Sequence, residues 1–217
     1  MTGRTDHGKI VIFARGARNA SSKFASAQAF TYAEYVIFAG NGFLSLNQIN
    51  PILYFADLSA DYTKYCYACF FLEICDKLLL PEMHTSDALQ ILLRSLNALN
   101  TDKLPANLVL AVFIFKFLQK EGIAPLSRSC PVCCDATKPV FAADGVVCPA
   151  CNPNAEGIPI TKGVFQALCY ILESRIEKML SFRAADNVVD DLFRCATYFL
   201  RTNVDVKIKS LEFKDNT

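Results

Sequence analysis

Two closely spaced pairs of cysteines constrain the fold of this chain more than any other feature. The first pair is Cys130 and Cys133, the second is Cys148 and Cys151, and each pair encloses two residues of which the first is proline. Thiolates bind Zn²⁺ tetrahedrally at about 2.3 Å, and two such pairs supply the four ligands of a closed site. The spacing therefore predicts one zinc ion that holds residues 126–159 together. Because four sulfur ligands leave no open position, this ion is expected to be structural and not catalytic.

Two disulfides, or unpaired core thiols, are the alternative explanation of these cysteines. Residues 1–6 lack the apolar segment of a secretory signal peptide, and disulfides are rare in the cytosol, so we favour zinc. The neighbouring Cys134 could replace one ligand, but only the predicted pair repeats the geometry of the second pair. Other cysteines, among them Cys66 and Cys69, are expected to be core thiols.

Composition indicates a globular protein with an uneven distribution of charge. Of the 217 residues 53% are hydrophobic, enough for a substantial core, yet no apolar run is long enough to span a membrane. A cytoplasmic protein is therefore expected. The net charge is only +1, but residues 1–30 carry five bases and one acid, whereas residues 31–200 carry 13 bases and 17 acids. A polyanion would bind at the basic end.

Residues 8–50 are predicted to form three antiparallel strands. The first is the β-branched and aromatic run 9–14, which leads into a basic loop. The other two, 30–38 and 43–49, flank a Gly-Asn-Gly sequence that suits a hairpin turn. Three such strands with one apolar face leave their outer edges unpaired.

After Pro51 the apolar residues recur every three or four positions, which predicts helices. The predicted helices cover residues 57–80, 85–99, 105–122, 161–181 and 186–200. The final alternation at 204–209 predicts either a short strand or an extended basic tail. The fold class is therefore α+β, with an antiparallel β region followed by an all-α domain into which the zinc module is inserted.

Motifs of catalysis are not found in the sequence. It contains no glycine-rich phosphate loop, nucleophile elbow or paired acidic motif. The neighbours Asp190 and Asp191 would point about 100° apart on a helix, so a solvated face is favoured over a metal clamp. The sequence predicts a binding protein and not an enzyme.

A set of short stretches, spread over nearly the whole chain, is specific through its order and spacing. They are residues 7–10, 15–18, 22–24, 40–43, 67–68, 72–74, 130–133, 145–151 and 208–211. Together they resemble the bacterial RecO family of recombination mediators.

The resemblance implies an N-terminal DNA-binding OB-fold over residues 1–52 and a helical domain over residues 53–217 that carries the zinc module. An OB-fold has five strands, and this chain opens at what resembles the end of the family's second strand, so the first strands are expected to be missing. The resemblance also implies binding of single- and double-stranded DNA, annealing of single strands, and association with the nucleoid. It implies that the protein works with RecR to load RecA onto DNA coated by single-stranded DNA-binding protein.

DNA contact is predicted at Lys9, Arg15, Arg18 and Lys23, four bases within fifteen residues that contain no acid. The alternative is that these bases only keep the domain soluble. The protein would then be a zinc-containing adaptor for other proteins with little affinity for DNA. Salt-dependent binding of single-stranded DNA distinguishes the two hypotheses.

Overall fold

The structure is a computed structural model of the 217-residue chain. It describes residues 2–5, 8–14, 29–40, 43–79, 86–125, 139–149, 154, 156–206, 208 and 210. The chain divides into two compact units, residues 1–89 with 208–217, and residues 90–207.

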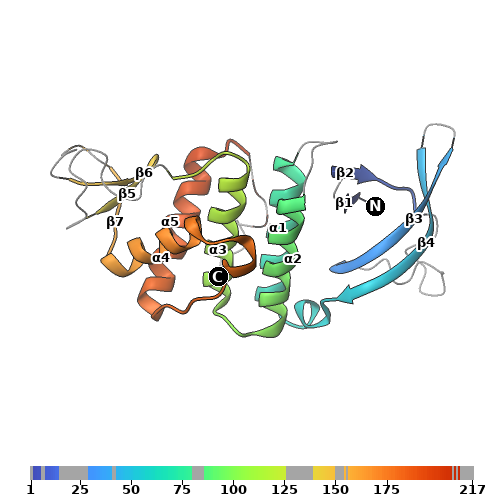
Figure 1. The fold of residues 1–217 in the computed structure, drawn as a ribbon, viewed down its shortest axis with the longest axis horizontal. Helices are drawn as coiled ribbons and strands as arrows, with labels where there is room; N and C mark the ends of the chain where they lie inside the picture. The colour runs from blue at the N-terminus through green and yellow to red at the C-terminus, as the bar shows by residue number, and fades with distance from the viewer. Residues whose placement is uncertain are drawn as a thin grey trace. The chain divides into compact units, whose positions relative to one another are not determined.

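Antiparallel strands come first in the chain and helices follow, which confirms the α+β class (Figure 1). The first elements along the chain are β1 (Thr2–Thr5), β2 (Gly8–Val11), β3 (Thr31–Gly40), β4 (Phe43–Tyr54), the 3-10 helix η1 (Ala56–Ser59), α1 (Tyr62–Leu78) and α2 (Ser86–Thr101). They are followed by α3 (Ala106–Lys120), β5 (Val140–Ala142), β6 (Gly145–Val147), β7 (Ile158–Pro159), α4 (Lys162–Glu173), the 3-10 helix η2 (Ile176–Lys178) and α5 (Asp186–Asn203).

The first unit contains two antiparallel hairpins, β1–β2 and the long, curved β3–β4 (Figure 1). Phe13 joins them, because its N–H donates to the carbonyl of Leu44 at 2.8 Å and its own carbonyl accepts from the N–H of Leu46 at 2.9 Å. The sequence-based interpretation missed β1. This strand reads Thr-Gly-Arg-Thr, so it has no apolar alternation to reveal it and pairs with β2 through its backbone.

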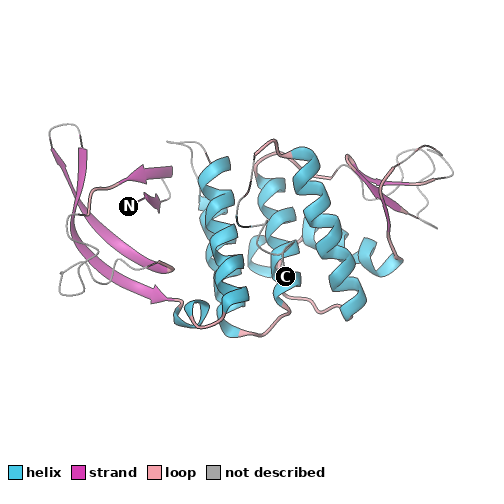
Figure 2. Ribbon diagram, turned by 180° about the vertical axis from the view of Figure 1, so that it is seen from behind, coloured by secondary structure: helices cyan, strands magenta, loops and turns pink. Residues whose placement is uncertain are grey.

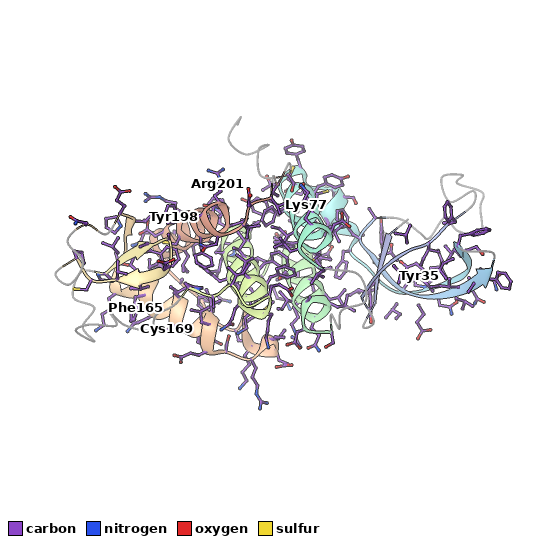
Figure 3. All side chains as sticks on the ribbon, turned by 90° about the horizontal axis from the view of Figure 1, so that it is seen from above. Tyr35, Lys77, Phe165, Cys169, Tyr198 and Arg201 are labelled. Carbon is purple, nitrogen blue, oxygen red and sulfur yellow. The ribbon has the colours of Figure 1, made fainter. Side chains whose placement is uncertain are left out.

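The inner face of these strands holds a small core of its own. Ile12 and Leu46 are buried at its centre. Partly buried side chains pack around them: Ile10, Ala14, Tyr35 (labelled in Figure 3), Ile37 and Ile49. Two irregularities in the β3–β4 register, one of them between Val36 and Ile37, keep the apolar residues on this face.

Helix α1 begins later than the predicted residue 57. The carboxylate of Asp61 accepts a hydrogen bond from the N–H of Lys64 at 2.9 Å and caps the helix, while the preceding residues form η1 and bury Leu58 completely. Near the end of the chain, the N–H of Ser210 donates to the carboxylate of Glu73 in α1 at 2.9 Å. No strand is found among the described residues of 204–210, and Ile208 is buried.

Helix α3 forms the centre of the second unit. Every residue from Leu108 to Leu118 is buried, as expected for a helix that is apolar on all sides and is packed against α4 and α5. The helix ends at Lys120, and the positive φ of Gly122, 83°, permits the N–H of Ile123 to donate to the carbonyl of Leu118. This end agrees with the sequence-based prediction.

A three-stranded antiparallel sheet, in the order β6–β5–β7, lies beside these helices (Figure 2). The ring of Phe141 in β5 lies 5.8 Å from that of Phe115 in α3 and 5.9 Å from that of Phe199 in α5. This aromatic cluster attaches the sheet firmly to the helical core.

Helix α4 ends at Glu173, whereas the sequence predicted a helix through residue 181. The ammonium group of Lys116, in α3, donates to the carbonyls of Ile171 at 3.0 Å and Leu172 at 3.2 Å, and also to that of Ser174. These are the free carbonyls at the end of α4, so a cation from another helix caps this terminus.

Candidate nucleic-acid interface

Three phenylalanines are exposed on the outer face of the first unit's strands. Phe13, Phe38 and Phe43 are 64%, 65% and 52% exposed, and Val11 and Val36 beside them are also exposed. We call these five residues the outer-face patch. Large apolar side chains gathered on one exposed surface indicate a site of interaction.

The alternation of the strands places these residues on one face. Ile10 and Ile12 point into the small core, so Val11 points outward. On the neighbouring hairpin, Phe38 is paired with Ser45, which in turn bridges Phe13 on its other side. Strands β3 and β4 and the bridged segment after β2 therefore each contribute one ring to the patch.

The rings of the patch are held in defined positions. Phe13 and Phe43 contact each other edge to face, with ring centroids 5.8 Å apart and planes at 76°. The ring of Phe38 lies against Gly40, where an added Cβ would come within 2.8 Å of the ring. A glycine at residue 40 therefore makes room for this ring.

The predicted DNA-binding bases lie close in the sequence to Val11 and Phe13 of this patch. Lys9 lies in β2, where its backbone is paired with that of Arg4. Arg15, Arg18 and Lys23 lie outside the described residues, so their role stays a prediction. In the sequence one residue separates Phe13, in the segment after β2, from Arg15.

Sequence reasoning missed the outer-face patch. The signal was present in residues 10–14, where apolar residues occupy both faces of the strand and not just one. Such a run is typical of a strand covered on both sides, yet here one side is exposed.

One of the four predicted zinc ligands lies in the described part of the chain. Cys148 follows directly after β6, is 5% exposed and forms no disulfide. Cys130, Cys133 and Cys151 lie outside the described residues, as does Cys134. Among the residues that the structure does describe, no group of three or more metal-binding side chains occurs. The buried free thiol at the end of a strand is compatible with a thiolate site, but the ligand set stays a prediction.

The other cysteines differ in their burial. Cys66 and Cys69, expected as core thiols, are only partly buried on α1. Cys195 in α5 is buried, and burial, with a smaller effect of Asp191, raises its pKa to about 12. A thiol with so high a pKa carries very little thiolate near neutral pH and is a poor nucleophile. Asp191 itself pairs with Arg194 at 3.3 Å.

A pocket of about 510 Å³ opens in the second unit between α2 and the segment that follows α4. Its wall includes three bases, Arg94, Lys103 and Arg183, against the single acid Glu177, and apolar side chains such as Phe182. Arg94 donates to the backbone carbonyl of Glu177 at 3.4 Å. The pocket therefore combines positive charge with an apolar surface.

The helices of the described ranges do not include one that is both long and apolar enough to cross a bilayer.

Comparison with known proteins covers both units. The family described as Recombination protein O N terminal matches residues 5–55, and the family described as Recombination protein O C terminal matches residues 59–212. The DNA repair protein RecO of Acetivibrio thermocellus is 30% identical over 95% of this chain and 84% of its own length. Those of Caldanaerobacter subterraneus and Clostridium perfringens (strain 13) are each 25% identical, covering 96% and 94% of this chain and 86% and 85% of their own lengths. The order of strands and helices agrees with these matches, and the chain belongs to the RecO family.

Proposed function

We propose that this chain is a DNA-binding mediator of recombinational DNA repair. It binds and anneals single-stranded DNA, also binds duplex DNA, and helps RecR load RecA onto DNA coated by single-stranded DNA-binding protein. Membership of a family of DNA repair proteins supports the role in repair. One observation supports the DNA-binding function most directly. The exposed Phe13 is followed closely in the sequence by the basic residues Arg15, Arg18 and Lys23.

In this proposal the strands of residues 1–52 form an OB-fold, and residues 53–217 form the helical domain. The curved β3–β4 hairpin, which the segment at Phe13 pairs with along β4, suits such a fold. In OB-folds the strand face and its loops bind nucleic acid, and the outer-face patch lies on the strand face.

The proposed zinc module, residues 126–159, has Cys130, Cys133, Cys148 and Cys151 as ligands. When bound, the ion would hold the loops around β5–β7 in place and take no part in chemistry. The burial of Cys148 after β6 supports this role.

The pocket beside Arg94, Lys103 and Arg183 is the proposed site for the acidic, apolar tail of single-stranded DNA-binding protein. The pocket lining has three bases and one acid, and this excess of positive charge attracts carboxylates. Its apolar wall accepts apolar side chains. An acidic, apolar peptide should bind the chain with micromolar or weaker affinity. Arg94→Glu combined with Arg183→Glu should abolish that binding while DNA binding is retained.

A titration with single-stranded DNA tests the main proposal. Fluorescence anisotropy at two salt concentrations should give tight binding at low salt that weakens steeply at high salt. If DNA hardly binds at either concentration, the alternative function, a zinc-containing protein-interaction adaptor, replaces it.

We also propose that the protein acts in the cytoplasm at the nucleoid and has no nuclease, ATPase or ligase activity. Turnover that disappears with a point mutation in this chain would contradict the last statement.

A further inference from the structure

We propose that the outer-face patch is a base-stacking site that makes unpaired nucleotides the preferred ligand of this chain. This inference rests on the proposed DNA-binding function and goes further, because it assigns the discrimination between single strands and duplex to three particular rings, those of Phe13, Phe38 and Phe43. The remaining surface would then bind phosphates without distinguishing the two forms of DNA.

The first step is the cost of exposing the patch. Apolar surface in water is unfavourable in proportion to its area, and each of these rings is more than half exposed. The strands bury the opposite face in the small core of Ile12 and Leu46, so the rings are not needed to complete that core. An exposed apolar cluster of this kind indicates a ligand.

The second step is the shape of the patch. Phe13 and Phe43 form an edge-to-face pair, and the ring of Phe38 lies against Gly40. Flat aromatic rings stack favourably on other flat aromatic groups, and every nucleobase has such a face. Phenylalanine has no polar atom to read a base edge, so the contact is independent of base sequence.

The third step is charge, which distinguishes a nucleic acid from other apolar partners. Five bases against one acid lie in residues 1–30, and Arg15 follows Phe13 after a single residue. A ligand that combines a polyanionic backbone with flat apolar groups satisfies both features at once. In a duplex the base faces are covered by their neighbours, so only unpaired bases can contact the rings.

Three probes of equal length test this inference on the full chain: oligothymidylate, the same deoxyribose-phosphate backbone without bases, and blunt duplex. The oligonucleotides should exceed ~16 nucleotides, the upper site size of one OB-fold. Wild-type protein should bind oligothymidylate more tightly than the abasic strand. Changing Phe13, Phe38 and Phe43 together to leucine should remove most of this preference. Each stacking interaction that the variant cannot form should lower affinity by roughly five-fold or more.

Leucine is chosen because it keeps the patch apolar and preserves folding, which the unfolding midpoint verifies. The same three residues changed to tyrosine should restore the preference for bases. Tyr62→Leu, at an exposed aromatic of α1 outside the patch, should have no effect. The slope of log affinity against log salt should remain that of wild type in the leucine variant, since phosphate contacts are intact.

Different results would overturn the two proposals separately. If the wild type binds none of the three probes, the DNA-binding function itself fails. If the wild type binds all three but gains nothing from bases, or the leucine variant keeps the full preference, only the stacking site fails. A wild-type dimer that dissociates in an alanine triple variant of unchanged DNA affinity would instead identify the patch as an interface between two copies of the chain.

Discussion

Lys116 is 2% exposed near the C-terminal end of α3, and its ammonium group is hydrogen-bonded. Its ammonium group donates to the carbonyls of Ile171, Leu172 and Ser174 at the end of α4 and also to the side-chain oxygen of Gln119. Lys116→Met keeps the apolar stem but leaves the carbonyl of Ser174 without this donor. Because bonds to a charged group contribute about 1.5–3 kcal/mol, we expect the free energy of unfolding to fall by about that amount in a urea titration. Lys103→Met, at an exposed lysine that precedes the same helix, should change it by less than about 0.5 kcal/mol.

The pH dependence of stability gives Lys116 a second signature. Burial, with a smaller contribution from Lys120, lowers the pKa of Lys116 from its usual value. The folded protein therefore holds this proton less tightly than the unfolded chain, and stability rises as the pH increases from the folded pKa toward the unfolded value near ~10.4. Wild type should gain stability relative to Lys116→Met over this alkaline range. A constant difference between the two proteins would contradict the assignment.

At the scale of elements, the sequence predicted helices best where local signals fix both ends. Helix α3 begins after Pro105 and ends before Gly122, and both residues mark helix boundaries through their own backbone preferences. Helix α4 was predicted too long because its end depends on Lys116, which is far away in the sequence. The β1 strand and the exposure of the outer-face patch likewise depend on which segments of the chain pair with each other. The spacing of apolar residues along the sequence does not reveal that pairing.

A carboxylate of α1, that of Glu73, binds the C-terminal segment at Ser210. Glu73 accepts hydrogen bonds from the backbone N–H and the hydroxyl of Ser210 and forms an ion pair with Lys77, labelled in Figure 3, at 2.8 Å. Glu73→Gln should lower the free energy of unfolding by about 1.5–3 kcal/mol and make the chain end more susceptible to protease. Thr63→Ala, at an exposed residue of the same helix, is the control. If Ser210→Ala lowers the free energy of unfolding as much in the Glu73→Gln variant as in the wild type, the two residues are not coupled.

The zinc module gives a prediction for the second unit as an element. Wild-type protein should contain one equivalent of zinc, and Cys130→Ser combined with Cys151→Ser should contain none. Such sites contribute on the order of 10 kcal/mol in isolated zinc peptides, so the double variant should also unfold at a clearly lower denaturant concentration. Cys66→Ser should keep both the metal and the stability. Well under one equivalent in the wild type, or unchanged stability in the double variant, would rule the site out.

At the scale of the whole molecule, the charge distribution predicts where DNA binds. Changing Arg15, Arg18 and Lys23 together to alanine removes three of the five bases in residues 1–30, which contain one acid. Each phosphate that the variant no longer neutralises should reduce the slope of log affinity against log salt by about 0.7 for single strands, whatever the base sequence. We therefore expect lower affinity and a slope that is smaller by up to about 2, with the zinc content unchanged.

A matched variant separates local contact from net charge. Lys162, Arg175 and Lys178 are exposed bases of the second unit, and their replacement by alanine changes the net charge by the same amount. If DNA binding followed net charge alone, both triple variants would weaken it equally and neither would identify a site. A large effect of the N-terminal variant only, measured by anisotropy on folded protein, would place the contact in the basic segment. If that variant binds DNA with unchanged affinity and slope, the contact lies elsewhere, and Lys207 and Lys209 are the bases to change next, since they give the chain end its positive charge.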